Sequence, residues 1–152
     1  MTYPSSMRVA TGVTLVELAI GLVVVAVIVA IAIPVHRVHR LRSARHEAIN
    51  ALQHIQTAEE GFFVAHDRYT AALTAQPPLG LGLTERSASG RYQLSVEVSD
   101  GGNLLGFAAR AHVRPGSAAA DDPICRSFSL DQNGLRSARD DAGHDETTEC
   151  WR

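Results

Sequence analysis

The chain has 152 residues and a formal net charge of −2 at pH 7, from fourteen basic and sixteen acidic side chains. This length allows one modest soluble domain attached to one long helix. The near-neutral charge gives no reason by itself to expect a nucleic-acid partner.

An apolar stretch runs from Val13 to Val35, where only Thr14, Glu17 and Pro34 are neither apolar nor small. A helix of this length covers roughly 35 Å, enough to cross a bilayer core of about 30 Å. A charged residue inside such a helix costs on the order of 2.5–3.5 kcal/mol. We therefore expect a membrane-spanning helix at 13–35 in which the Glu17 carboxylate has a function.

A short polar leader, 1–12, precedes this stretch and ends in Gly12. A secretory signal has the opposite order, because its cleavage site follows its apolar part. The run Gly-Val-Thr-Leu-Val-Glu-Leu from Gly12, with the apolar run that ends at Pro34, resembles the class III signal and N-terminal helix of type IV prepilins. Val13 stands where most pilins have Phe, and Thr11 where many have a basic residue.

The resemblance implies that a prepilin peptidase cuts between Gly12 and Val13 and methylates the new amine of Val13. Residues 13 and 17 lie one helical turn apart on the same face, so Glu17 can pair with that amine within the chain or in a neighbouring subunit. The second pairing would set the register of stacked helices, and an incidental Glu in a membrane anchor is the alternative. We expect translation to start at Met7 rather than Met1, which gives a shorter basic leader.

An amphipathic pattern follows Pro34. Apolar residues recur at spacings of three and four: Val35, Val38, Leu41, Ala44, Ala48, Leu52, Ile55, Ala58 and Phe62. Polar residues take the other faces: Arg37, Arg40, Arg42, Arg45, Glu47, Gln53, Gln56 and Glu59. The pattern predicts one helix from about Val13 to about His66, kinked at Pro34 because proline lacks a backbone donor. Its second half, 36–66, should pack on a globular head.

The arginines between Arg37 and Arg45 conflict with the prepilin resemblance, because the positive-inside rule would place them in the cytoplasm. We expect them outside the inner membrane, where they contact anionic lipid or neighbouring subunits or form a solvated face.

His36, His39 and His46 lie close to one helical face. No further ligand is identifiable, so solvated histidines are expected rather than a metal site.

The remaining residues, 67–152, predict a head with a loop at 67–90 and a sheet at 91–138. The loop glycines lack the spacing of a phosphate cradle. Period-two alternation predicts four strands and two turns: strands 92–98, 105–114, 125–130 and 135–138, with turns at 100–103 and 131–134. Each strand has one apolar face, so the long helix should cover one side of the sheet. The expected fold is α+β, with a four-stranded antiparallel sheet.

Cys125 and Cys150 both lie near the C-terminus. In a membrane-tethered chain such a pair is typical of a disulfide made in an oxidising compartment, and two free buried thiols are the alternative. A bridge would close a loop of about 25 residues, worth roughly 3.5 kcal/mol. With the terminal Cys-Trp, the segment 125–150 is similar to the disulfide-bounded region of PilE-like minor pilins of type IVa. The acidic residues of this segment that could suggest a calcium site lack the spacing of a calcium-binding loop. They are Asp131, Asp140, Asp141, Asp145 and Glu146.

The two resemblances imply a structural subunit, a minor pilin held in the inner membrane with a periplasmic head and then assembled into an extracellular filament. Adhesion, twitching motility and DNA uptake are the functions this leaves open. The implied partners are other pilins, major and minor, the prepilin peptidase, the inner-membrane assembly platform and membrane lipid.

Two alternatives share this architecture. One is a type II secretion pseudopilin, against which the cysteine pair argues. The other is a tip pilin that binds DNA or a surface through a basic patch, composed of Arg86, Arg91, Arg110 and Arg114. An enzyme is not expected, since no nucleophile elbow, phosphate loop or metal-ligand spacing occurs. No catalytic residue, cofactor or metal is therefore assigned.

Overall fold

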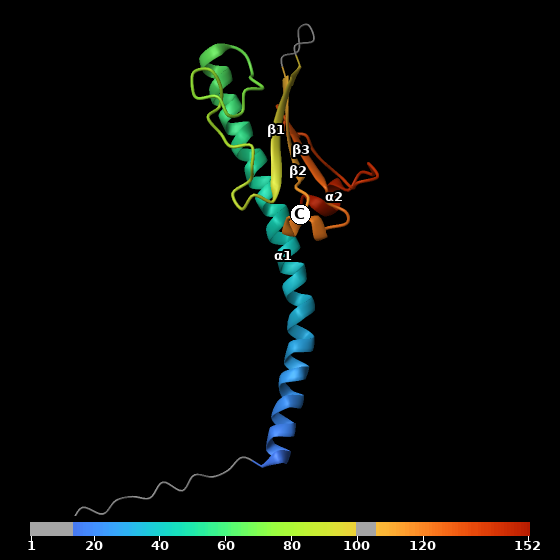
Figure 1. Ribbon diagram of the computed structural model, residues 1–152. Coiled ribbons are helices and arrows are strands. Elements are labelled where there is room, and N and C mark those ends of the chain that lie inside the picture. Colours follow the sequence, from blue (N-terminus) through green and yellow to red (C-terminus); the bar gives the residue numbers. More distant parts are fainter. Residues whose placement is uncertain (1–13, 100–105) are drawn as a thin grey trace, which may run out of the picture. The chain divides into compact units, whose positions relative to one another are not determined.

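The computed structural model describes residues 14–99 and 106–152 (Figure 1). Its elements are, in order, α1 (Leu15–His66), β1 (Tyr92–Ser99), β2 (Gly106–Val113), the 3₁₀ helix η1 (Ala118–Asp121), β3 (Ser127–Asp131), β4 (Arg136–Arg139) and α2 (Thr147–Cys150). The predicted cleavage site between Gly12 and Val13 and the predicted turn at 100–103 lie outside the described residues.

The chain divides into two compact units between Arg37 and Val38. In the first unit α1 exposes its large apolar side chains from Leu15 to Ile31, with exposed fractions between 47% and 85%. The helix assignment continues through Pro34, and the kink expected there stays a prediction. Within the described part of the chain, no helix is both long enough and apolar enough to cross a membrane.

The second unit contains one four-stranded sheet with the strand order β1-β2-β3-β4. All three neighbouring pairs are antiparallel, so the predicted sheet is confirmed. β3 begins at Ser127 rather than at Cys125, and β4 runs one residue beyond the predicted end. Gly134, with φ 75°, occupies the turn between these strands, a left-handed conformation that glycine adopts without steric cost.

The core of the second unit lies between α1 and one face of the sheet (Figure 1). Ala48 and Leu52 of α1 are completely buried, as are Ala109 and Ala111 of β2. The strands alternate between buried and exposed residues, because successive side chains point to opposite faces of a sheet. The long helix therefore covers one face, as the sequence predicted, and the α+β pilin-like fold is confirmed.

The prediction for the polar faces of α1 was wrong at Glu59, which is 0% exposed. Arg45 and Glu47 are also largely covered, with side chains 18% and 10% exposed. Loops of the head flank the helix on both sides and bring hydrogen-bonding partners to these three residues. Each of them connects α1 to a different part of the head.

Candidate functional site

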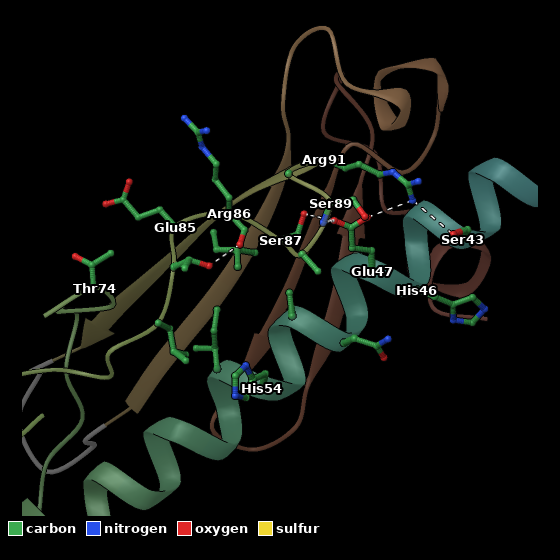
Figure 2. A pocket seen from close by; sticks show the side chains of 18 of the residues that line it. Ser43, His46, Glu47, His54, Thr74, Glu85, Arg86, Ser87, Ser89 and Arg91 are labelled. Carbon is green, nitrogen blue, oxygen red and sulfur yellow. Dashed lines mark hydrogen bonds and ion pairs between the residues drawn. The ribbon is translucent and has the colours of Figure 1, made fainter. Parts of the chain in front are cut away.

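A groove of about 1540 Å³ separates the second half of α1 from the loop that leads into β1 (Figure 2). Glu47 fastens the loop to the helix. Its Oε1 accepts hydrogen bonds from Ser87 Oγ at 2.5 Å and from the Ser89 N–H at 2.7 Å. Its Oε2 lies 3.2 Å from Arg91 Nη1, so Glu47 also neutralises that arginine.

The α1 wall of the groove carries three histidines and one arginine: His39, Arg42, His46 and His54. His39 and His46 are exposed. They are separated by two turns of helix, about 11 Å, which is too far for them to share one metal ion. The predicted histidine His36 falls among residues whose side chains the structure does not describe.

Glu59 is a carboxylate enclosed between α1 and the loop that follows it. Its Oε2 accepts the Thr70 N–H at 3.1 Å, whereas its Oε1 has no hydrogen-bond partner among the described residues. Burial raises the pKa of Glu59, and the hydrogen bond from Thr70 opposes this only in part. The sequence held a signal for this burial, since Glu59 continues the apolar stripe four residues after Ile55.

Replacing Glu59 by glutamine is expected to stabilise the head at pH 7. Because its pKa is raised from 4.5, the carboxyl group contributes stability below pH 4.5, and that stability is lost as the pH rises through the folded-state pKa. Glutamine stays neutral and keeps an oxygen for the Thr70 N–H. Thermal unfolding between pH 4 and pH 8 measures the difference, which should shrink towards pH 4.5.

The control is Glu60→Gln, because the neighbouring Glu60 is exposed and its replacement should change the unfolding temperature little at any pH. A Glu59→Gln protein that is less stable than wild type at pH 7 would contradict the account. It would mean that the buried carboxylate has a partner it needs in its ionised form.

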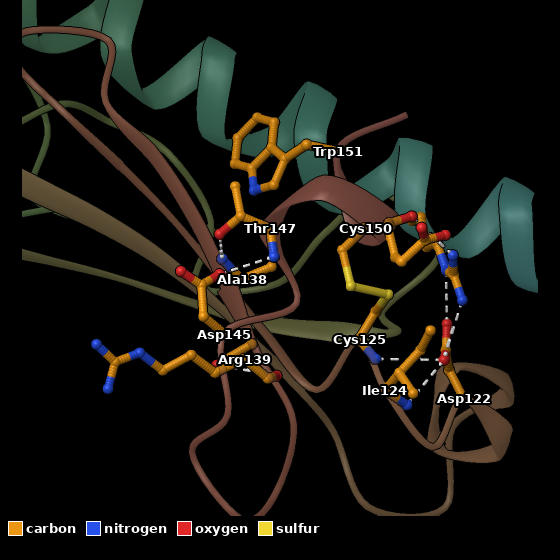
Figure 3. Close-up of a disulfide and its surroundings, with 12 residues drawn as sticks. Asp122, Ile124, Cys125, Ala138, Arg139, Asp145, Thr147, Cys150 and Trp151 are labelled. Carbon is orange, nitrogen blue, oxygen red and sulfur yellow. Dashed lines mark hydrogen bonds and ion pairs between the residues drawn. A yellow bond between two sulfur atoms is a disulfide. The ribbon is translucent and has the colours of Figure 1, made fainter.

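A disulfide joins Cys125 to Cys150, with a Cα–Cα distance of 5.6 Å and both residues completely buried (Figure 3). The predicted pairing is therefore present. α2 supplies Cys150, and Trp151 follows it with its Nε1–H donating to Ser137 O at 3.0 Å. The C-terminal segment is thus held against β4 as well as against the loop before β3.

Arg45 connects α1 to this disulfide region. Its Nε donates to Asp122 Oδ2 at 2.7 Å, its Nη2 to Oδ1 at 3.2 Å, and its Nη1 to the carbonyl oxygen of Glu149 at 3.1 Å. Asp122 also accepts the N–H groups of Ile124 and Cys125, each at 3.2 Å. Burial alone would raise the pKa of Asp122, but these hydrogen bonds outweigh it and lower the pKa below its ordinary value.

Of the four arginines of the predicted basic patch, two are bound at the loop that leads into β1 and two are not. Arg91 is held by Glu47, and Arg114 Nη1 donates to the carbonyl oxygen of Gly90 at 2.7 Å. Arg110 forms an ion pair with Glu97, and Arg86 has no ion pair within residues 14–99 and 106–152. Of the four side chains, only those of Arg86 and Arg110 are not bound to Glu47 or to the backbone of the loop that leads into β1.

The acidic residues considered for calcium do not converge. Four carboxylates make local contacts: Asp131 accepts the N–H of Asn133, Asp140 pairs with His144, Asp141 pairs with Arg126, and Asp145 accepts the N–H of Thr147. Within the described chain, no group of three or more His, Cys, Asp and Glu residues is arranged to hold a metal ion.

A comparison with known families matches part of the chain. Residues 34–129 match the model of a family described as type IV minor pilin ComP, DNA uptake sequence receptor. The match covers more than half of the chain and includes the second half of α1, the groove, β1, β2 and the start of β3. No curated protein matches the chain.

Proposed function

We propose the function of this chain from one premise: it belongs to the type IV minor pilin family described as ComP, DNA uptake sequence receptor. The chain is a minor pilin, and a minor pilin interacts with other pilins in a pilus. In our proposal the precursor is inserted in the inner membrane, cut by prepilin peptidase between Gly12 and Val13, and passed by the assembly platform into an extracellular filament.

The first unit supports this assembly route through its uncovered apolar surface. Large apolar side chains from Leu15 to Ile31 are exposed, and a contiguous surface of this kind marks a membrane or protein interface. Membrane lipid would cover it before assembly and neighbouring pilin helices afterwards. A type II secretion pseudopilin, the alternative from the sequence, has no observation in its favour.

Glu17 lies in the first turn of α1, where its backbone N–H and its carboxylate have separate roles. Its backbone N–H donates to Thr14 Oγ1 at 3.2 Å, which is half of a capping box. Its own carboxylate is exposed, and one helical turn separates it from the amine that cleavage would create at Val13. We propose that this amine, in the same or a neighbouring subunit, is its partner.

Glu17→Ala is therefore expected to leave cleavage intact and to reduce incorporation into filaments about 100-fold. The factor follows from leaving one ammonium uncompensated in an apolar core, at about 2.5–3.5 kcal/mol. Quantitative mass spectrometry of sheared filaments and of membranes measures it, with Glu60→Ala as the control on the same helix. If the Glu17→Ala chain is incorporated normally, Glu17 has no role in assembly. If the head of this variant misfolds, the role of Glu17 is structural.

For the filament we propose DNA uptake, rather than adhesion or twitching motility, as the main role. The family description names a DNA receptor, and all fourteen basic residues of this chain are arginine. The planar guanidinium matches phosphate geometry with two parallel donors, which the lysine ammonium does not. Arginine is thus well suited to the partner that the family description names.

The test is direct binding. Full-length chain in detergent should retard end-labelled, sheared chromosomal DNA from its native host at about 50 mM salt, and the retardation should weaken steeply by about 200 mM. Absence of binding at the lower salt concentration would contradict the receptor role and leave a minor pilin that acts in assembly.

A further inference from the structure

A chain of hydrogen bonds runs from Glu59 into the loop that follows α1. Glu59 Oε2 accepts the Thr70 N–H at 3.1 Å, and Thr70 Oγ1 accepts the Ala72 N–H at 3.1 Å. The carbonyl oxygen of Ala72 then accepts the Leu81 N–H at 3.0 Å. We call residues 70–83 the anchored loop, because the buried carboxylate on α1 is the first member of this chain.

The anchored loop forms part of the wall of the groove that α1 borders on the other side (Figure 2). Two backbone hydrogen bonds close the loop, from the Leu83 N–H to Leu73 O at 2.9 Å and from the Gly82 N–H to Ala75 O at 2.8 Å. Thr74, Gly82 and Leu83 line the groove. The conformation of the anchored loop therefore sets the shape of the groove on this side.

Glu59 has no charged partner in the part of the chain that the structure describes. Its side chain is completely buried and makes no ion pair among those residues. Its Oε1 accepts no hydrogen bond from them either. The carboxyl group is thus held by one backbone N–H, which leaves half of its accepting capacity unused.

The charged and titratable residues of the surrounding elements lie apart from this carboxyl group. On α1, Glu60 is exposed and the His66 ring stacks on Phe62. At the start of the loop, Asp67 and Arg68 are exposed. Those of β1 and β2 are on exposed positions of the sheet, turned away from α1: Glu97, Arg110 and His112. Burial therefore dominates the pKa of Glu59 and raises it, while the hydrogen bond from Thr70 opposes the rise in part.

An ionised carboxylate in this position lacks the water that stabilises its charge. It can regain water without unfolding the sheet, because loops open locally at a lower free energy than the core of a sheet. Opening of the anchored loop and loss of the Glu59 proton are then linked, and each favours the other.

We propose that Glu59 is a pH-sensitive switch, which holds the anchored loop on α1 when its carboxyl group is protonated and lets the loop open more often when the group is ionised. This inference concerns the wall of the groove and does not depend on the DNA receptor role. Because the pKa of Glu59 is raised from 4.5, the closed loop is most stable below pH 4.5, and that stability is lost as the pH rises through the folded-state pKa. The groove wall is therefore firmer in acid than at neutral pH.

Hydrogen exchange on the full-length chain in detergent, followed by NMR between pH 4 and pH 8, tests the switch. The reporters are the amides of Leu81, Gly82 and Leu83, whose hydrogen bonds break when the anchored loop opens. The reference is the Val113 N–H, which donates to Arg126 O across the sheet at 2.9 Å. After correction for intrinsic exchange rates, the reporters should be less protected than Val113. Their opening equilibrium constant should rise with pH, by at most about tenfold per pH unit, and then level off.

Two variants separate Glu59 from its surroundings. Glu59→Gln removes the ionisable group and should make the protection of the reporter amides independent of pH. Glu60→Gln changes an exposed neighbour and should keep the wild-type profile. If Glu59→Gln does not fold, Glu59→Met, which is apolar and of similar length, takes its place with the same expected result.

Three results would overturn the proposal. The first is reporter protection that does not depend on pH in the wild type. The second is a pH dependence that persists when Glu59 is replaced. The third is equal protection of the reporters and Val113 at every pH, which would mean that Glu59 reaches water only when the whole head unfolds.

Discussion

Replacing Asp122 by alanine is expected to lower the free energy of unfolding of the head by about 3–5 kcal/mol. The substitution removes the acceptor of two hydrogen bonds from Arg45 and leaves that guanidinium largely enclosed, with 18% of its side chain exposed. It also leaves the N–H groups of Ile124 and Cys125 without their carboxylate. Because the ion pair joins residues 77 positions apart, its loss leaves the hydrogen bond from Arg45 to the carbonyl oxygen of Glu149 as the remaining contact of this arginine with the disulfide region.

Denaturant unfolding measures this effect, and the neighbouring residue provides the control. Asp121, the last residue of η1, carries the same charge, but its side chain is 74% exposed and lies 3.9 Å from Arg40. Asp121→Ala should therefore change stability by no more than about 0.5 kcal/mol. Equal effects of the two substitutions would mean that the contact between Arg45 and Asp122 does not hold the helix to the head.

Removing the disulfide by the double substitution Cys125→Ser and Cys150→Ser is expected to cost about 3.5 kcal/mol. The bridge closes a loop of 25 residues, and most of its effect in the chain-entropy model comes from restricting the unfolded chain. In the folded head the two cysteines are completely buried, so serine hydroxyls there also lack partners. Unfolding of the oxidised wild type and of the double variant gives the difference directly.

The disulfide effect should also couple to that of Asp122. Arg45 contacts Asp122 on one side of the bridge and the carbonyl oxygen of Glu149 on the other. We expect the combined variant to depart from additivity by more than about 0.5 kcal/mol. A loss below about 1 kcal/mol for the double cysteine variant would contradict a stabilising role for the bridge.

The parts of the fold that depend on local periodicity were predictable from the sequence. Tyr92 to Ser99 alternates strictly, and period-two alternation assigns each side chain to a face of the sheet. The end of α1 at His66 follows in the same way from the end of the apolar stripe. Glu59 was assigned to the wrong face because Ala58 and Glu59 both fit the stripe at spacings of three or four, and hydropathy favoured the alanine.

The contacts that assemble the candidate sites were not predictable, because they join distant segments. Glu47 accepts from Ser87 at a separation of 40 residues, and Arg45 pairs with Asp122 at 77. No local pattern encodes which loop reaches which helical turn. The basic patch that the sequence suggested included Arg91, whose guanidinium is paired with Glu47 of α1 in the folded head.

The central claim is that this minor pilin is processed at Gly12 and carried into a filament by its N-terminal helix. Mass spectrometry of sheared surface filaments tests it most directly. The account predicts a mature chain that begins with N-methylated Val13 and contains the Cys125–Cys150 bridge. A chain found only in membranes, with an intact N-terminus and free thiols, would contradict it.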